Sequence, residues 1–298
     1  MSEWQGLVTK NQNGYYSVRT ERAEYLCKVR GKMKQDNNRV LVGDWVRIAA
    51  IDSDRAVITE ICPRHNRLLR PPVANLDQAL LVTSVASPPM NPLLLDRLIM
   101  MCILNRISPI LWFSKMDLQT PQSDKELAVY KSLPYRIYTS DNSDKEENQQ
   151  TLAAIREQLQ GKVTTVCGQS GVGKSTLLNA IAGREWCPVQ SVSQRIGRGK
   201  NTTRHAVIGE IYPSCYVADT PGFASLDYLP PRKEEIASGF HEIAARQDKC
   251  RFHDCTHRHE PQCAVKNAVD AQEIAAPRYQ SYVTLVAEWE EREKERFR

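Results

Sequence analysis

The sequence predicts an α/β fold in which a P-loop domain with a mostly parallel sheet lies between an all-β barrel and a helical metal-binding segment. Three observations support this. Residues 1–70 contain short strand-like runs separated by glycines and polar turns. Across residues 71–229, strands and helices alternate around the glycine-rich stretch GQSGVGKS. Residues 230–298 have a helical pattern that is interrupted by a cluster of cysteines and histidines.

The composition limits the class of protein. The 298 residues are 41% hydrophobic and 25% charged, which is typical of a globular chain with two or three domains. No apolar run approaches the roughly 20 residues that cross a bilayer, and the N-terminus lacks a signal-peptide pattern. Six of the nine cysteines stand singly, mostly in apolar segments, as expected for reduced thiols. We therefore expect a cytoplasmic protein with no membrane association, and we also expect a monomer.

Residues 1–70 are predicted to form a five-stranded OB-fold barrel that binds RNA. They hold 13 Lys and Arg against 8 Asp and Glu, and this basic stretch also carries Tyr15, Tyr16 and Tyr25. OB barrels bind oligonucleotides by stacking bases on aromatic rings and following the backbone with cations. The alternatives are that the tyrosines only pack and that the charge is an ordinary solvated face. The expected strands are Gly6–Lys10, Tyr15–Arg19, Glu24–Val29, Trp45–Ala49 and Ala56–Ile61.

Residues 71–229 are predicted to form a doubly wound domain, because strand and helix patterns alternate. Ser123 and Glu126 resemble a helix capping box, and the polar stretch 141–150 is predicted to be a linker. The expected strands are Leu76–Ser84, Pro109–Phe113, Arg136–Thr139, Lys162–Cys167, Ala206–Tyr212 and Cys215–Ala218. The expected helices are Pro92–Leu104, Ser123–Leu133, Thr151–Leu159 and Thr176–Ala182.

A phosphate-binding loop is the strongest motif in the chain. It follows a predicted strand and opens a predicted helix, which is the context that this motif requires. Its glycines let backbone N–H groups surround phosphate oxygens, Lys174 would reach the β- and γ-phosphates, and Ser175 would bind Mg²⁺. The alternative is a chance glycine-rich turn. The nucleotide-binding residues predicted here are Gly168, Gln169, Ser170, Gly171, Val172, Gly173, Lys174, Ser175 and Thr176.

Ser114-Lys115-Met-Asp117 follows the predicted strand at 109–113 and resembles the guanine-specificity motif Asn-Lys-x-Asp. The Asp117 carboxylate would accept two hydrogen bonds from guanine, and adenine would leave it unpaired at a cost of ~1–3 kcal/mol. The Lys115 stem would pack along the base. Thr139 and Ser140, after the next strand, would supply backbone contacts to guanine. Serine in place of asparagine at position 114 is expected to weaken bonding between the loops.

Two further segments complete the predicted nucleotide site. Asp219, at the end of a strand, suits an outer ligand of Mg²⁺, and the Gly222 N–H would reach the γ-phosphate. Between the P-loop and Asp219, residues 197–204 resemble a switch loop in which Thr202 or Thr203 would join the Mg²⁺ shell while GTP is bound. The guanine motifs precede the P-loop, the reverse of the usual GTPase order, so a circularly permuted domain is predicted.

Cys250, Cys255, His257 and Cys263 provide three thiolates and one imidazole within 14 residues, the ligand set of a closed structural zinc site. His253 and His259 lie close by, so spacing alone does not decide which histidine binds. A disulfide is a poor alternative in a cytosolic chain, and a catalytic zinc would need an open position. One structural Zn²⁺ is therefore predicted, and it would contribute folding energy to residues 230–298.

Taken together, these motifs resemble the circularly permuted bacterial GTPases called ribosome small-subunit-dependent GTPase A, over the whole chain. The resemblance implies a factor that binds the maturing small ribosomal subunit and its rRNA and hydrolyses GTP to GDP and phosphate. It also implies activity that is slow alone and stimulated by the subunit, and His257 as the zinc-binding histidine. The domains it implies are residues 1–70, 71–229 and 230–298.

The resemblance also shows two departures at the catalytic positions. Phe223 stands where many GTPases have a glutamine that orients water, and Asn201 stands where relatives often carry a catalytic histidine. Asparagine can hydrogen-bond water but cannot act as a base. We expect a low intrinsic rate that depends on the subunit ordering residues 197–204, with His205 as a substitute. The predicted catalytic residues are Lys174, Asn201, Thr202 and Thr203.

Two other functions remain open from the residues alone. One is a P-loop kinase for small molecules, in which the 114–117 motif would be a coincidence. The other is an RNA-binding scaffold with an inactive P-loop. In the GTPase interpretation, loss of the γ-phosphate releases the switch loop and the 219–223 segment and shifts the zinc domain. The charged segment Glu288–Arg298 is expected to be a solvated helix.

Overall fold

The computed structural model describes residues 3–30, 39–69, 72–187, 206–219 and 227–296. These residues form two compact units. Unit 1 comprises Met1–Ala79, Gln149–Cys167 and Gly173–Ala224, and unit 2 comprises Leu80–Asn148, Gly168–Val172 and Ser225–Arg298. The domain boundaries predicted at residues 70 and 229 stay a prediction. Among the described residues, no helix combines the length and the apolar character needed to cross a membrane.

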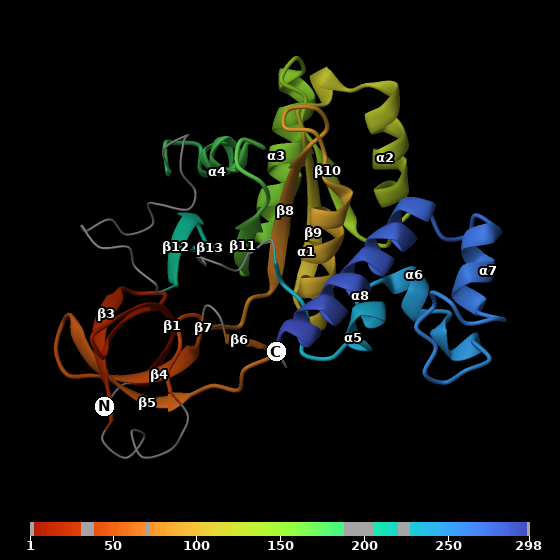
Figure 1. The fold of residues 1–298 in the computed structure, drawn as a ribbon. Helices are drawn as coiled ribbons and strands as arrows, with labels where there is room; N and C mark the ends of the chain where they lie inside the picture. Colours follow the sequence, from red (N-terminus) through yellow and green to blue (C-terminus); the bar gives the residue numbers. More distant parts are fainter. Residues whose placement is uncertain (1–2, 31–38, 70–71, 188–205, 220–226, 297–298) are drawn as a thin grey trace. The chain divides into compact units, whose positions relative to one another are not determined.

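The N-terminal strands of unit 1 close into a barrel in the order β1-β2-β3-β5-β4 (Figure 1). β3 and β5 pair in parallel, and every other neighbouring pair of strands in the barrel is antiparallel. Alternate residues point inward to a core that includes Val18, Cys27, Ile48 and Ile58. The predicted barrel is confirmed. Its strands are β1 (Glu3–Gln12), β2 (Tyr15–Arg19), β3 (Glu24–Val29), β4 (Trp45–Ala50) and β5 (Arg55–Ile61).

The segment that leaves the barrel is fixed to it by buried polar groups. Asp44, fully buried, accepts from Arg64 Nε at 2.6 Å and Nη2 at 2.7 Å. The Asn75 side chain donates to the Gly43 carbonyl at 2.9 Å and accepts from the His65 N–H at 3.0 Å. A short hairpin of β6 (Arg67–Leu69) and β7 (Pro72–Ala74) follows. The barrel therefore continues into the next domain through a bonded connection.

The central sheet has six strands in the order β10-β9-β8-β11-β13-β12. β9 and β10 are parallel, as are β11 and β13, whereas β12 pairs with β13 as an antiparallel edge hairpin. β8 is buried along its whole length, in keeping with its apolar sequence. The strands are β8 (Gln78–Ser84), β9 (Ser108–Ser114), β10 (Arg136–Thr139), β11 (Val163–Cys167), β12 (Val207–Tyr212) and β13 (Cys215–Asp219).

The helices of the sheet domain are α1 (Pro92–Leu104), α2 (Pro121–Lys131), α3 (Lys145–Leu159) and α4 (Lys174–Ala182). Three predicted starts were wrong, because α2 and α3 are capped earlier by a polar side chain and α4 is capped earlier by the left-handed Gly173. Thr120, not Ser123, caps α2, and Ser123 is the N3 partner of its capping box. The carboxylate of Asp144 accepts from the Glu147 N–H at 2.9 Å, so α3 begins inside the predicted linker. α4 begins two residues early, at Lys174.

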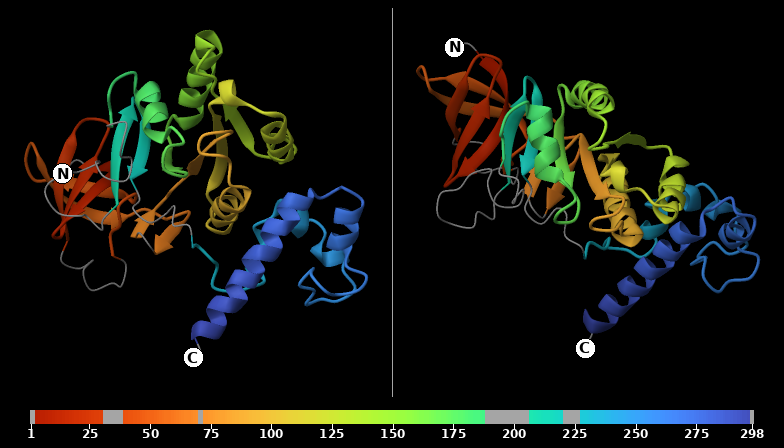
Figure 2. Two further views of the ribbon diagram at one scale, coloured as in Figure 1. Left: turned by 45° about the horizontal axis from the view of Figure 1, so that its top comes forward. Right: turned by 90° about the horizontal axis from the view of Figure 1, so that it is seen from above.

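In unit 2 the C-terminal helices share one core with α1, which includes Met100, Phe240, Tyr282 and Leu285. Figure 1 shows α8 crossing α1, and Figure 2 shows α8 as one unbroken helix. The predicted helical character of this region is confirmed. Its helices are α5 (Glu235–Ser238), α6 (His241–Ala244), α7 (Ala264–Asp270) and α8 (Ala276–Arg296).

A buried ion-pair network joins α8 to α1 within this core. The guanidinium of Arg278, on α8 and 1% exposed, donates to Asp96 of α1 at 2.5 Å and to Glu242 of α6 at 2.7 Å. It also lies 4.6 Å from the ring centre of Phe240. The Tyr130 hydroxyl of α2 donates to Asp96 at 2.9 Å. The network thus links residues from four helices, with the Arg278 cation at its centre.

The first turn of the segment 288–298 is not merely solvated, so that prediction was wrong there. Glu288 accepts from the buried Arg97 at 2.6 Å, and the Trp289 indole donates to the Pro230 carbonyl at 2.9 Å. Glu290 accepts from Arg258 at 3.0 Å. Charge alternation in the sequence did not reveal these partners because they come from distant segments of the chain.

We expect Arg278→Met to lower the free energy of unfolding by about 3–5 kcal/mol, because it leaves the Asp96 and Glu242 carboxylates without their buried cation. Denaturant unfolding of the purified protein measures this change. The exposed Arg292 lies on the same helix, and Arg292→Met should alter stability by no more than ~0.5 kcal/mol. Equal stability of the two variants would contradict a structural role for the network.

Candidate nucleotide and metal sites

The two segments predicted to contact the base lie side by side at the ends of β9 and β10. The Ser140 N–H donates to the Phe113 carbonyl at 2.9 Å, and the Met116 N–H donates to the Ser140 carbonyl at 3.0 Å. The Asn142 N–H donates to the Asp117 carboxylate at 3.1 Å. Residues 114–117 and 139–140 therefore form one bonded surface. Asp117 is exposed on it.

This surface is bonded to residues 168–172 of the phosphate-binding loop, which belong to unit 2 as it does. The buried Ser114 Oγ lies 2.7 Å from the Val172 carbonyl oxygen and 3.1 Å from that of Thr83. Lys115 Nζ donates to the Gly171 carbonyl at 3.0 Å and also to the Ser87 carbonyl. The predicted base segment and phosphate loop are thus in direct contact. Serine at position 114 retains a hydroxyl contact with the phosphate loop in place of the expected asparagine.

Glycines set the shape of the phosphate-binding loop. A Cβ at Gly168 would lie 2.0 Å from the Val82 carbonyl oxygen, so only glycine permits this approach to β8. Gly173, with φ of 96°, is the left-handed N-cap of α4. Because α4 starts directly after it, the N–H groups of the first helical turn lack carbonyl partners within the helix and are suited to an anion.

The ammonium group of Lys174 is partly removed from water. Burial lowers the pKa of Lys174, since removing an ammonium group from water disfavours its charge. A bound phosphate would favour the charged form. Ser175 is buried, and Gln169, Ser170 and Thr176 are partly or fully exposed. Arg156 of α3 donates to the Ala180 and Ile181 carbonyls at 2.8 Å and so holds the far end of α4.

Some predicted nucleotide residues are not tested by the structure. Asp219 is the last residue of β13 and is half-buried. Asn201, Thr202, Thr203 and Gly222 lie outside the described residues, as do His205 and Phe223. Their predicted roles stay predictions.

The four predicted metal ligands converge in unit 2, with all their ligand atoms within 4.8 Å of one another. The Cys250 and Cys263 sulfurs are 3.8 Å apart, and His257 Nδ1 lies 3.5 Å from each. A tetrahedron with Zn–S bonds of about 2.3 Å and Zn–N bonds of about 2.0–2.1 Å would give about 3.8 Å and about 3.5–3.6 Å. Burial lowers the pKa of His257, which favours the neutral, metal-binding imidazole. The residues fit a zinc ion.

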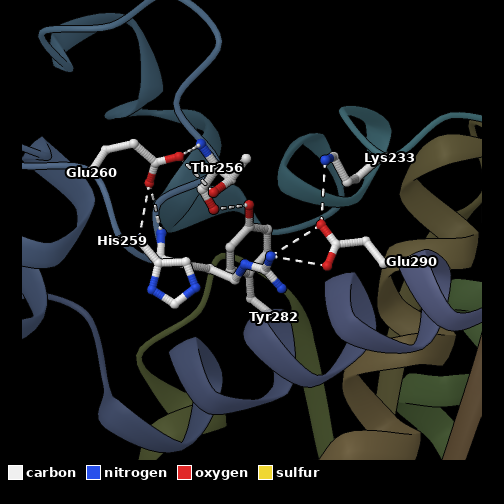
Figure 3. Close-up of polar contacts among 7 residues, drawn as sticks. Lys233, Thr256, His259, Glu260, Tyr282 and Glu290 are labelled. Atoms are coloured by element: carbon white, nitrogen blue, oxygen red, sulfur yellow. Dashed lines mark hydrogen bonds and ion pairs between the residues drawn. The ribbon is translucent and has the colours of Figure 1, made fainter.

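Residues that the sequence analysis missed surround this cluster. Figure 3 shows Glu260 accepting hydrogen bonds from the loop that carries His257, with Tyr282 and Glu290 of α8 next to that loop. Burial raises the pKa of Glu260, but hydrogen bonds from Thr256 and from backbone N–H groups outweigh it and lower the pKa to about 2. The sequence shows a glutamate three residues after a histidine ligand, but most of its hydrogen-bond partners are backbone N–H groups, which a sequence pattern does not reveal.

The barrel carries a smaller aromatic surface than predicted. Tyr16 and Tyr25 are buried in its core, at 7% and 6% exposure, so their predicted stacking role was wrong. Tyr15 is 42% exposed, and the Lys28 ammonium lies 4.7 Å from its ring centre. Alternation along β2 and β3 explains the error, since neighbouring residues in a strand face opposite sides and Tyr16 and Tyr25 face inward. Tyr15 with Lys28 remains as a candidate stacking position.

The permuted order of the base segment and phosphate loop, together with the barrel, defines a circularly permuted GTPase. A family model described as "RsgA GTPase" matches residues 61–229, and one described as "RsgA N-terminal domain" matches residues 5–58. The chain belongs to the RsgA GTPase family and is a GTP-hydrolysing enzyme. The predicted family and fold class are confirmed.

Full-length relatives and solved structures agree with this assignment. A Halalkalibacterium halodurans protein named "Small ribosomal subunit biogenesis GTPase RsgA" is 41% identical, over 98% of this chain and 99% of its own. A Caldanaerobacter subterraneus protein of the same name is 37% identical over the whole of both chains. The crystal structure of YjeQ from Thermotoga maritima superposes with a TM-score of 0.80 at 32% identity, covering 96% of this chain and 98% of that one. The structure of YloQ, described as a circularly permuted GTPase, gives a TM-score of 0.79 at 32% identity and covers 98% and 96%.

We expect Ser114→Ala to weaken guanine-nucleotide binding about five-fold, because losing this buried hydroxyl contact to the phosphate loop costs about 1 kcal/mol. Titration with a fluorescent GDP analogue measures the dissociation constant. Ser132→Ala removes a hydroxyl that donates to a backbone carbonyl at the exposed end of α2 and should leave affinity unchanged. If both variants bind the nucleotide as tightly as the parent, the Ser114 contact does not support nucleotide binding.

Proposed function

We propose that this chain is a GTPase that binds the small ribosomal subunit and assists its late maturation, with GTP hydrolysis stimulated by the subunit. The observation that carries the proposal is the contact of Ser114 and Lys115 with the Val172 and Gly171 carbonyls of the phosphate loop. It puts a guanine-type motif against a P-loop, which a chance resemblance at residues 114–117 would not do. The names of the full-length relatives support the ribosomal role.

The proposed nucleotide site assigns one task to each segment. Asp117 recognises the guanine edge, and the segment 139–140 supplies backbone contacts to the base. Gly168–Ser175 surrounds the phosphates, with Lys174 on the β- and γ-phosphates and Thr176 beside them. Ser175 and Thr202 would hold Mg²⁺, with Asp219 in its outer shell, and the ion would neutralise developing charge on the phosphates. The Gly222 N–H would contact the γ-phosphate.

Hydrolysis then depends on positioning and electrostatics rather than on a covalent intermediate. Asn201 and Thr203 would order the attacking water once the subunit fixes the 197–204 segment. Because asparagine cannot take up a proton at neutral pH, the basal rate is expected to be low. Cys250, Cys255, His257 and Cys263 would hold one structural zinc ion. The protein would work in the cytoplasm, where bacterial subunits mature, and its monomeric state stays a prediction.

The decisive experiment measures phosphate release from GTP and from ATP, with and without isolated small subunits. We expect subunits to accelerate GTP turnover only. Asp117→Asn should lower the preference for guanine over adenine by about 10- to 100-fold, because it removes bonds to a charged acceptor worth ~1.5–3 kcal/mol.

Asp124→Asn, an exposed change on α2, serves as the control and should keep the preference. Phosphate transfer to a small molecule would instead indicate a kinase. Subunit binding without turnover, retained in Lys174→Ala, would indicate a scaffold. Either result would overturn the proposal.

The barrel surface gives a separate prediction. Tyr15→Ala should weaken small-subunit binding by about five-fold or more, since a lost stacking contact with a base costs ~1–3 kcal/mol. Tyr212 of β12 is also 42% exposed and lies 5.0 Å from the Arg156 guanidinium, so Tyr212→Ala is a matched control. Co-sedimentation with subunits measures binding. Equal affinities of the two variants would exclude Tyr15 as a contact.

A further inference from the structure

The loop Thr256–Glu260 carries the histidine of the metal cluster and is folded around a single carboxylate (Figure 3). One oxygen of Glu260 accepts from the Thr256 N–H at 2.8 Å and from the Thr256 hydroxyl at 2.6 Å. The other accepts from the Arg258 and His259 N–H groups at 3.1 Å each. Three backbone donors of one five-residue loop thus converge on a carboxylate from the same loop.

This arrangement holds the metal ligand in an unusual backbone conformation. His257 has a φ of 60°, in the left-handed region that is unfavourable for a residue with a side chain. The N–H groups on either side of it, at Thr256 and Arg258, are both bonded to Glu260. The charge-assisted bonds offset the cost of that turn. The His257 ring is 3.5 Å from two of the three cysteine sulfurs as a result.

The carbonyl groups of the same loop are held by α8. The Tyr282 hydroxyl donates to the Thr256 carbonyl at 2.9 Å, and the Tyr279 hydroxyl donates to the His257 carbonyl at 2.7 Å. Arg258 Nη2 lies 3.0 Å from both oxygens of Glu290, which also accepts from Lys233 at 3.4 Å. The loop is therefore fixed on both its N–H and its carbonyl side.

Glu260 is not available as a ligand in this arrangement, because its two oxygens already serve four donors. We propose that Glu260 is the positioning residue of the metal centre: it folds the 256–260 loop so that His257 completes the three-thiolate set. The inference rests on the proposed zinc site. Preorganisation of this kind saves the entropy of ordering a loop when the metal binds, and it slows metal release.

The test uses Glu260→Gln in the full-length protein. Glutamine has nearly the same size, but its NH₂ group cannot accept a hydrogen bond, so two of the four donors lose their partner. We expect zinc loss to a chromophoric chelator to be about 10- to 100-fold faster, the usual effect of a residue that orients a metal ligand. In the Co²⁺-substituted protein, the absorption bands of a tetrahedral three-sulfur, one-nitrogen site should weaken or shift.

Glu273→Gln is the matched control, since Glu273 also accepts from an arginine of the same region but does not contact the loop. Thr256→Val is a milder second variant that removes only the hydroxyl donor, and it should accelerate zinc loss in the same direction. If Glu260→Gln does not fold, Thr256→Val decides the matter.

The outcomes separate the two ideas. A parent protein that binds neither zinc nor cobalt would refute the zinc site, and this inference with it. A parent that holds zinc, with variants at positions 260 and 256 that release it at the parent's rate, would overturn the role of Glu260 alone.

Discussion

Contact between the base segment and the phosphate loop is the constraint on which the nucleotide site depends. Ser114 and Lys115 leave the end of β9 and reach carbonyl groups of Val172 and Gly171, which lie more than fifty residues later in the chain. Because Ser114 and Lys115 bond to backbone carbonyls, they fix the position of the base segment independently of the side chains of the phosphate loop. The base segment and residues 168–172 of the phosphate loop therefore stay together, although their order along the chain is permuted. This explains how a permuted connectivity retains a working GTPase fold.

The C-terminal helices complete the half of the sheet domain that holds this base segment. Arg278 reaches Asp96 on α1, and Tyr130 of α2 shares the same carboxylate. The metal loop in turn lies against α8 through Tyr279 and Tyr282. A zinc ion bound there would stabilise a region that shares its core with α1. The segment that carries the Cys/His cluster is therefore an integrated part of unit 2 and not an appendage.

Features with fixed local spacing were predictable from the sequence. The phosphate loop and the Cys/His cluster depend on a few residues at set intervals, and the barrel strands follow from alternation and turn residues. The starts of α2, α3 and α4 were misplaced because caps at Thr120, Asp144 and Gly173 act through a single hydrogen bond or a single backbone conformation. Long-range partners were invisible, since nothing near Arg278 in the sequence identifies Asp96.

The same long-range pairing affects how the chain is made. The partner of Asp96, Arg278, lies 182 residues later in the chain, and the partner of Arg97, Glu288, lies 191 residues later. During vectorial synthesis the barrel can close early, because its strands all lie within the first 61 residues. α1, by contrast, emerges with Asp96, which is buried in the folded protein. Its counter-charge, Arg278, is synthesised only with α8, after most of the chain has left the ribosome. A nascent chain cut short before α8 would carry that charge on an incomplete core and would expose more unfolded chain to proteases.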